Sequence, residues 1–543
     1  MDIEKNLILI REEDRTDEIE SLSYVYEKYH ISFYNNVKVY TYNTDKVQYF
    51  QIIEKINPQE YNVKLSDNQT SSIETILNFG EYYKIIYQNG KVGLYKKEEV
   101  CLQKNYLNDV NVKRLFEYYK EVAHNIGLET NGKNILESQY EKIKTLSDDS
   151  ILLSYLLDNF PVSEKTMVQE LIYPFGINQS QKNAVENAFS SRASIVQGPP
   201  GTGKTQTILN ILVNIICLNK SVAVVSNNNS ATYNVLEKLK KNGLDFLAAF
   251  LGCSDNKKLF IESQDEEYPD MIDWELSENE RKNLLQEIIT LTNVINEMFN
   301  AKNRLAAIEQ EFLSLTPEEH YFNEYYTSLK DIKDFSLKNL SFKKVLGLWL
   351  DFEKYTKNGT KLNLLQKIVV FFRYNNEILN FFSNPAEQVI PYLQKEYYHT
   401  KIIELNNEKE KLTKLLENDQ FTIKLKELTE KSMCYFKAIL ATRYTYKEKR
   451  QVFSNFDFES NAEGFIQEYP IILSTTHSIK NSLSSNIIYD YLIIDEASQV
   501  DLVTGVLAFS CAKNIIIVGD KKQLPNVISN EHRELVGKIE RED

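Results

Sequence analysis

The residues from 198 to 205 read GPPGTGKT and have the types and spacing needed to hold a phosphate chain. They match the pattern G-x-x-x-x-G-K-[ST] and lie between an apolar run and the start of an amphipathic helix. Glycines let backbone N–H groups turn inward around phosphate, and the helix directs its positive end towards the same point. We therefore expect Lys204 to reach the β- and γ-phosphates of ATP and Thr205 to ligate Mg²⁺. The predicted ATP-binding residues of the loop are Gly198, Pro199, Pro200, Gly201, Thr202, Gly203, Lys204, Thr205 and Gln206.

A pair of acids follows a second apolar run, in the segment LIIDEAS. Asp495 is the candidate for holding Mg²⁺, and Glu496 is the candidate for polarising the attacking water. An acidic pair after a strand is by itself more often a helix cap or solvated charge. Its place downstream of the phosphate loop, and its continuation into Gln499, favour the catalytic interpretation.

The segment GDKKQLP, residues 519–525, follows a third apolar run. We expect the side-chain amide of Gln523 to contact the γ-phosphate and to sense its hydrolysis. Taken alone, the segment would be read as a polar turn.

The order GPPGTGKT, DEAxQ and GDxxQLP resembles superfamily 1 helicases, and more narrowly the up-frameshift and senataxin-like branch. The resemblance implies that Gln181, in NQSQKNAV, reads the adenine ring. It also implies that Asn229, Thr475 and Thr476 contact the sugar–phosphate backbone of single-stranded nucleic acid, for which short polar side chains are suited. Without the family context these residues would be assigned to a helix surface or to loop capping.

Members of that family have two RecA-like lobes, and the second lobe supplies arginines that complete the ATP site. The present sequence ends 18 residues after Pro525. We therefore expect a first lobe that needs a second one, in cis or in trans, and that hydrolyses almost no ATP by itself.

The elements that position these residues follow from the apolar runs. Residues 173–254 and 465–543 alternate strand, loop and helix, which predicts one RecA-like lobe with a parallel sheet. Lys204 and Asp495 lie 291 residues apart, and removing residues 255–464 leaves 81, an ordinary distance between such motifs.

Residues 255–464 read as a helical insertion that projects from the lobe as an antiparallel hairpin of coiled-coil type. Its two apolar seams are Leu284, Ile288, Leu291, Ile295, Met298, Leu305 and Phe312, and Tyr398, Ile402, Leu405, Leu412 and Leu416.

The part before the lobe divides into a small β-rich domain, residues 1–105, and a helical connector, residues 106–172. Asn89 and Gly90 between two alternating runs predict a type I′ hairpin. The predicted fold is thus α/β: a P-loop NTPase sheet with a long helical insertion, preceded by a small β domain. Interleaved Tyr and Lys in the β domain favour a half-buried strand over stacking on bases.

Composition excludes several classes of protein for this chain. Five cysteines lie singly along 543 residues, so neither a disulfide framework nor a zinc site is indicated, and a cytoplasmic location is expected. No apolar run approaches the roughly 20 residues of a membrane span, so no membrane partner is expected. The net charge of −14 argues against a broad basic face but leaves room for a narrow basic groove.

Two other classes of protein share some of these features. A chromosome-tethering ATPase of the SMC kind also has a helical hairpin between its nucleotide motifs, but it needs an LSGGQ-like signature before the acidic motif, and none stands there. A non-catalytic binding module that uses nucleotide as a switch remains open.

We predict that Lys204→Ala abolishes nucleotide binding and leaves the fold intact. The glycines shape the loop, whereas the lysine supplies the charge that faces phosphate. Titration with a fluorescent ATP analogue measures the effect, and equal affinity of variant and parent would refute the assignment of the loop.

Overall fold

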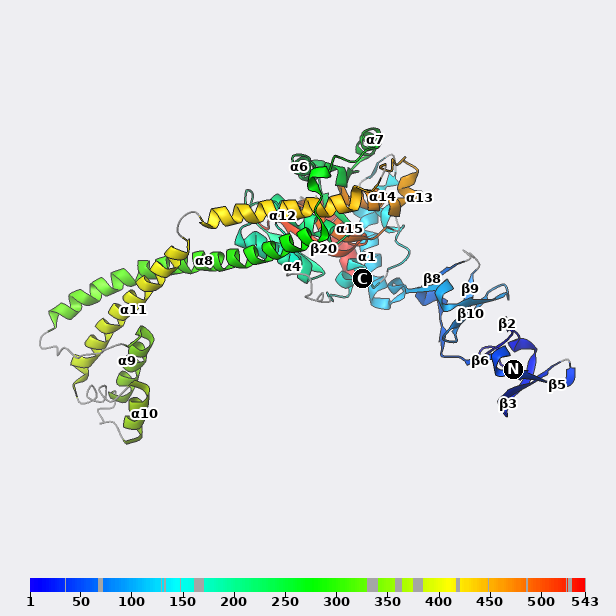
Figure 1. Ribbon diagram of the computed structural model, residues 1–543, viewed down its shortest axis with the longest axis horizontal. Coiled ribbons are helices and arrows are strands. Elements are labelled where there is room, and N and C mark those ends of the chain that lie inside the picture. Colours follow the sequence, from blue (N-terminus) through cyan, green and yellow to red (C-terminus); the bar gives the residue numbers. More distant parts are fainter. Residues whose placement is uncertain are drawn as a thin grey trace. The chain divides into compact units, whose positions relative to one another are not determined.

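A computed structural model shows a mixed α/β chain made of two compact units (Figure 1). The first unit comprises Met1–Leu171, Ser180–Glu275 and Ile439–Asp543, and the second comprises Ile172–Gln179 and Leu276–Ala438. The structure describes residues 1–34, 36–66, 72–127, 129–130, 133–146, 148–160, 170–329, 340–356, 364–374, 384–416, 420–447, 449–484, 487–523, 525 and 530–542.

A six-stranded parallel sheet lies at the centre of the first unit, and its strand order is β15-β20-β19-β16-β18-β17. The predicted α/β fold with a P-loop sheet is confirmed. The strands are β15 (Ala193–Gln197), β16 (Val222–Ser226), β17 (Ala248–Phe250), β18 (Ile471–Thr475), β19 (Tyr489–Ile494) and β20 (Ala512–Gly519).

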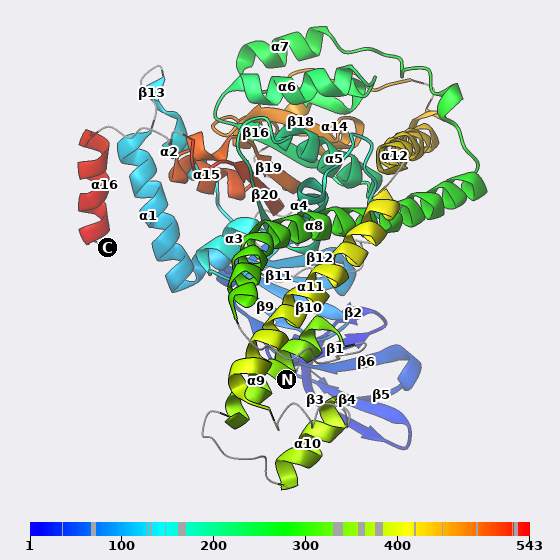
Figure 2. The same ribbon diagram turned by 90° about the vertical axis from the view of Figure 1, so that its left-hand side faces the viewer.

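The inner strands are almost continuously apolar because both faces of the sheet are covered. All five residues of β16 are buried, as are four of the five in β18. Such runs favour strand over helix, since β-branched side chains pack well on a pleated surface. Figure 2 shows α1, α2 and α15 on one side of these strands and α5 on the other.

The helices of the first unit begin and end as follows: α1 (Val110–Ile126), α2 (Ile135–Tyr140), α3 (Ile151–Leu156), α4 (Gln179–Ser190), α5 (Lys204–Cys217), α6 (Asn229–Lys240), α7 (Ser254–Glu262), α13 (Asp457–Ser460), α14 (Ala462–Glu468), α15 (Leu502–Phe509) and α16 (Asn530–Glu542). Helices α1 to α3 share one hydrophobic core with the sheet, in which Phe116 and Tyr140 pack against each other. The Tyr140 hydroxyl also donates to the carbonyl of Val503 in α15 at 2.7 Å. The predicted connector helices therefore pack into the core of the sheet, and the predicted domain boundaries stay predictions.

The N-terminal part consists of short antiparallel strands grouped in four small sheets. They are β1 (Asn6–Ile10), β2 (Glu13–Asp14), β3 (Ile19–Val25), β4 (Lys28–Phe33), β5 (Asn36–Asn43), β6 (Val47–Gln51), β7 (Glu54–Ile56), β8 (Tyr61–Leu65), β9 (Ile73–Asn78), β10 (Tyr82–Tyr87), β11 (Val92–Lys96) and β12 (Val100–Lys104). A two-stranded sheet, β13 (Glu129–Thr130) with β14 (Lys133–Asn134), follows α1.

The hairpin between β10 and β11 forms, but the predicted type I′ turn is wrong. Tyr87 donates its N–H to the carbonyl of Lys91, and Gly90 donates to the carbonyl of Tyr87, both at 2.9 Å. Only Gly90 has a positive φ, of +79°, whereas a type I′ turn needs two such residues. Three residues therefore form the loop, as a type I turn closed by a left-handed glycine. The buried positions of Ile85 and Tyr87 hold the strands in this register.

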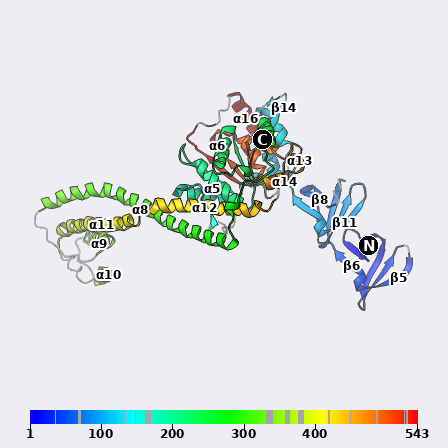
Figure 3. The same ribbon diagram turned by 45° about the horizontal axis from the view of Figure 1, so that its top comes forward.

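The second unit is helical, and its longest element is α8 (Glu278–Ser328) (Figure 3). The N-terminal half of α8 runs antiparallel to α12 (Gln420–Tyr444), with the rings of Phe299 and Phe421 5.4 Å apart. Its C-terminal half runs antiparallel to α11 (Ala386–Leu416), to which Arg304 connects through Glu408 at 2.7 Å. Helices α9 (Phe342–Thr356) and α10 (Leu364–Tyr374) lie between α8 and α11 in the chain.

Four residues of the first predicted seam are buried: Ile288, Leu291, Ile295 and Met298. Farther along α8, Ile308 and Leu315 pack with Leu405 of α11. A coiled-coil geometry stays a prediction. No helix among the described residues is long and apolar enough to cross a membrane.

We predict that replacing residues 276–438 by a flexible Gly/Ser linker leaves nucleotide affinity within about twofold of the parent. The second unit has hydrophobic clusters of its own, so the sheet keeps its core without them. Titration with a fluorescent ATP analogue provides the test, and Lys204→Ala in the shortened chain is the control. A shortened chain that is insoluble, or that binds no nucleotide, would contradict the prediction.

Candidate active site

The predicted catalytic and nucleotide-binding residues follow the carboxyl ends of the strands in the parallel sheet. The phosphate loop follows β15, the acidic pair follows β19, and Gln523 lies four residues after β20. Of the predicted nucleic-acid residues, Asn229 lies three residues after β16, Thr475 is the last residue of β18 and Thr476 directly follows it. In open parallel sheets, ligands bind at this edge, so a single site can use all of these positions.

The phosphate loop is held by hydrogen bonds at both ends. The N–H of Gly198 donates to the carbonyl of Gly519 in β20 at 3.1 Å. The backbone N–H and the side-chain hydroxyl of Thr202 both donate to the carbonyl of Pro199, at 3.3 and 2.7 Å. The loop is therefore closed on itself and tied to the neighbouring strand.

Gln181, near the start of α4, packs against the end of this loop. Its Nε2 lies 3.2 Å from the carbonyl of Thr202, 3.3 Å from that of Gly203 and 3.1 Å from Oε1 of Gln206. A Cβ on Gly203 would lie 2.1 Å from the same Nε2, and φ of Gly203 is +85°. The positive φ favours glycine at this position, whereas the end of the flexible Gln181 side chain could move aside. The adenine-reading role of Gln181 stays a prediction.

Helix α5 begins at Lys204, so its positive N-terminal end faces the loop. Ten consecutive residues from Thr207 to Ile216 are buried, which anchors the helix in the core. Lys204 and Thr205, on the first turn, are both half-buried.

Lys204 and Glu496 face each other, with Nζ and Oε1 3.3 Å apart. The contact is an ion pair without the alignment of a hydrogen bond. Lys204 Nζ and Glu496 Oε2 are both buried, and neither has a hydrogen-bond partner among the described residues. Glu496 also has a left-handed backbone, with φ of +50°. A non-glycine residue in this region is uncommon and occurs often at functional sites.

Asp495 directly follows β19 and is only 6% exposed. Its backbone N–H donates to the carbonyl of Val225 at 2.8 Å, and its Oδ1 accepts from the N–H of Glu496 at 2.9 Å. Burial raises the pKa of Asp495 above its ordinary value, although the Glu496 N–H lowers it, and the charge of Glu496 adds to the rise. A cation placed beside Asp495 would offset this cost of burial.

Gln523 is positioned by Asp520, a residue to which the sequence motifs assign no role. The N–H of Gln523 donates to the carbonyl of Asp520 at 3.1 Å, and Oδ1 of Asp520 accepts from Lys522 N–H at 2.9 Å. The Oε1 of Gln523 is buried and has no hydrogen-bond partner among the residues that the structure describes. An aspartate directly after an apolar strand is the signal that could have identified this turn.

The predicted nucleic-acid residues lie around Gly252, just after β17. Asn229 Oδ1 would lie 2.2 Å from a Cβ at Gly252, and the Thr475 hydroxyl lies 3.5 Å from the Gly252 carbonyl. Thr476 is fully buried, and its N–H donates to the carbonyl of Ser226 at 3.0 Å. The exposed Asn228 caps α6. Contact with nucleic acid stays a prediction for Asn229, Thr475 and Thr476.

These residues fit ATP and Mg²⁺. Three side chains after different strands, Lys204, Glu496 and Gln523, have buried polar atoms without a hydrogen-bond partner. An ammonium, a carboxylate and an amide are the groups that hold phosphate, orient water and sense a phosphoryl group. Asp495 and Thr205 supply the oxygen ligands that Mg²⁺ prefers.

Comparison with known proteins places these residues in a family. Residues 176–531 match the sequence profile of a family described as AAA domain. The chain is 30% identical over 152 residues to an uncharacterized ATP-dependent helicase (MJ0104) of Methanocaldococcus jannaschii, covering 27% of this chain and 19% of that protein.

Two further relatives are named an ATP-dependent helicase and a regulator of nonsense transcripts. An uncharacterized ATP-dependent helicase (MG140 homolog) of Mycoplasma pneumoniae is 23% identical over 578 residues, covering 89% of this chain and 50% of that protein. Regulator of nonsense transcripts 1 of Caenorhabditis elegans is 32% identical over 119 residues, covering 20% of this chain and 11% of that protein. The chain thus spans half or less of the length of these relatives.

We predict that Asp495→Asn stabilises the nucleotide-free protein at pH 7 and raises its melting temperature by about 2 °C. Folding raises the pKa of Asp495, so its charged form destabilises the fold once the pH exceeds the pKa of the unfolded state. The gain in melting temperature of the variant must therefore shrink as the pH falls through the raised pKa of the folded state. Thermal unfolding between pH 7 and pH 5 measures it.

Asp490→Asn is the matched control. Burial raises the pKa of Asp490, but hydrogen bonds from Ser221 and the charge of Lys513 outweigh it, so the net shift is downward. This variant should lower the melting temperature at pH 7. A lower melting temperature for Asp495→Asn as well would contradict our account of the site.

Proposed function

The chain belongs to the AAA domain family of superfamily 1 helicases, and we propose that it is the ATP-binding, first RecA-like lobe of a nucleic-acid helicase or translocase. The observation that carries this proposal is the meeting of Lys204 and Glu496, 3.3 Å apart, at the carboxyl edge of a parallel sheet. They come from motifs 292 residues apart in the sequence, and each has a buried polar atom suited to a phosphate or to water.

Each residue has a distinct role in the proposed hydrolysis. Lys204 and the loop N–H groups bind the β- and γ-phosphates, and Gln181 contacts adenine. Glu496 orients the attacking water and accepts its proton, while Gln523 contacts the γ-phosphate. Thr205 and Asp495 would hold Mg²⁺, which would supply positive charge to offset the charge that develops on the phosphate oxygens.

The Lys204–Glu496 pair suits a site that must be switched on by substrate. Without nucleotide, each charge neutralises the other inside a half-buried site. When Lys204 turns to phosphate, Glu496 is released from this contact and can face the attacking water. The left-handed backbone at Glu496 holds its side chain at the end of β19 during this exchange.

We propose that single-stranded nucleic acid crosses the same sheet edge near Asn229, Thr475 and Thr476. The support is their position at the carboxyl ends of β16 and β18, beside the strands that carry the ATP site. Coupling would then run through the shared strands, because β19 pairs directly with β16. Two other similar proteins are named a DNA helicase, in Schizosaccharomyces pombe, and a putative ATP-dependent RNA helicase, in Saccharomyces cerevisiae, so the proposal covers both kinds of nucleic acid.

Full activity in this proposal needs a second RecA-like lobe, in cis or in trans. Hydrolysis spreads negative charge over the γ-phosphoryl oxygens, and an arginine from outside the P-loop raises the rate by about 10³–10⁵. Arg443 and Arg450 are not near the motifs: they bond to the carbonyls of Ile216 and Phe246.

We predict that these 543 residues alone bind ATP·Mg²⁺ weakly and show only trace ATPase activity, little stimulated by single-stranded nucleic acid. Adding a second lobe should raise the rate by orders of magnitude. Release of phosphate, measured with and without an oligonucleotide, tests this. Glu496→Gln is the control: it should abolish turnover while keeping nucleotide bound.

Two outcomes would contradict the prediction of trace ATPase activity. Turnover of several per second by the chain alone, lost in Glu496→Gln, would mean that the chain or a second copy supplies the arginine. Nucleotide-dependent partner binding without hydrolysis, unchanged by Glu496→Gln and by a second lobe, would instead show a nucleotide-switched binding module.

A further inference from the structure

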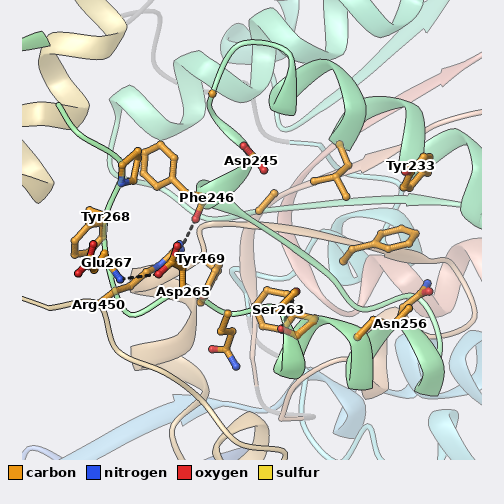
Figure 4. Close-up of a pocket in the computed structure, with 18 residues that line it drawn as sticks. Tyr233, Asp245, Phe246, Asn256, Ser263, Asp265, Glu267, Tyr268, Arg450 and Tyr469 are labelled. Carbon is orange, nitrogen blue, oxygen red and sulfur yellow. Dashed lines mark hydrogen bonds between the residues drawn. The ribbon is translucent and has the colours of Figure 1, made fainter. Parts of the chain in front are cut away.

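A groove of about 670 Å³ lies in the first unit, and none of its lining residues belongs to the predicted ATP or nucleic-acid site (Figure 4). One wall is formed by α6 and by the 3-10 helix η7 (Asp245–Leu247), which leads into the edge strand β17. The other is formed by α7 and by the segment that follows it, up to Pro269. Arg450 and Tyr469 also line the groove, and both follow the residues of the second unit in the sequence.

Aromatic rings line the groove along its length. Tyr233 and Phe250 pair at one end, with ring centres 6.0 Å apart, and Phe260 packs on Tyr469 at 4.9 Å. Tyr268 lies at the other end and is half-buried, while Tyr233 is half exposed. Flat rings of this kind bind apolar groups and the faces of cations.

The one guanidinium of the groove is already neutralised. Arg450 is only 7% exposed, and its Nε donates to Oε1 of Glu468 at 3.1 Å. Its guanidinium stacks over Tyr469, 4.2 Å from the ring centre. Glu468 also accepts hydrogen bonds from the Tyr268 hydroxyl, at 2.6 Å, and from Lys447, at 3.1 Å. Arg450 is therefore part of the wall and is not available to an anionic ligand.

Three carboxylates of the groove are not neutralised. Asp245, Asp265 and Glu267 line it, and none of them forms an ion pair with any described residue. Asp265 and Glu267 are exposed and Asp245 is half-buried. The groove thus combines aromatic walls with three carboxylates that form no ion pair with a described residue, and such carboxylates repel phosphate and attract ammonium or guanidinium groups.

We propose that this groove binds a basic segment of a partner protein, with one side chain against Tyr233 and Phe250 at one end and the charge of a Lys or Arg beside Asp265 and Glu267 at the other. Carboxylates and aromatic faces together recognise a cation more strongly than either does alone. The volume holds a few side chains of an extended peptide. The site is separate from the proposed helicase chemistry and would recruit a partner to the lobe.

The test uses the full chain and a fluorescein-labelled peptide, Gly-Arg-Val-Arg-Val-Arg-Gly, measured by fluorescence anisotropy. The same peptide with Glu in place of Arg is the probe control. We expect the basic peptide to bind and the acidic one not to bind. The double variant Asp265→Asn, Glu267→Gln should weaken binding at least tenfold, and Tyr233→Ala should weaken it several-fold.

The matched control is the double variant Glu237→Gln, Glu262→Gln, which removes the same charge from exposed positions of α6 and α7 that do not line the groove. It should leave binding within about twofold. Unchanged melting temperature and ATP-analogue affinity verify that each variant is folded. Equal losses in both double variants would show a general charge effect and overturn the proposal. Weakened binding of a dT15 oligonucleotide, but not of the peptide, in the groove variant would overturn it in favour of nucleic acid.

Discussion

The parallel direction of all six strands in the central sheet is the constraint on which the rest of the first unit depends. Parallel strands place their carboxyl ends at one edge, so a loop after any strand reaches the same region. Each return to the starting edge needs a crossover, and α5 and α6 provide two of these. The phosphate loop, the acidic pair and Gln523 therefore meet although the chain between them includes Leu276–Ala438 of the second unit. The insertion enters after β17, the edge strand, and leaves before β18, so it leaves the order of the inner strands unchanged.

The same geometry explains how the site can bury charge. Asp495 is enclosed by the ends of β16 and β19, and its pKa is raised chiefly because the carboxyl group is buried there. Lys204 and Glu496 offset each other at 3.3 Å in a half-buried place. Such an arrangement costs stability unless a ligand supplies the missing partners. Burial of the apolar strands and of ten residues of α5 stabilises the fold and offsets this cost.

The first unit thus presents two surfaces of opposite character. The phosphate loop uses a lysine and a helix N-terminus, which suit an anion. The groove beside β17 uses carboxylates and aromatic rings, with its arginine held by Glu468, and suits a cation. In our proposals, one surface takes ATP and the other takes a basic partner segment. Because their charges differ, neither ligand competes well for the other's site, which would let a partner bind while nucleotide turns over.

The sequence by itself determined the residues of the nucleotide motifs, the parallel sheet and the helical insertion, because glycine spacing, continuous apolar runs and heptad-like seams are local patterns. It also predicted the hairpin after Tyr87, but not its turn, because the register of β10 and β11 depends on which faces are buried. Only the tertiary structure decided that Gln181 packs on Gly203, that Asp520 positions Gln523, and that α1 to α3 join the core of the sheet. The groove could not be predicted from the sequence either, because Arg450 and Tyr469 lie about 200 residues after Phe246 in the chain. These features depend on contacts between distant segments, and no local pattern of residues encodes such contacts.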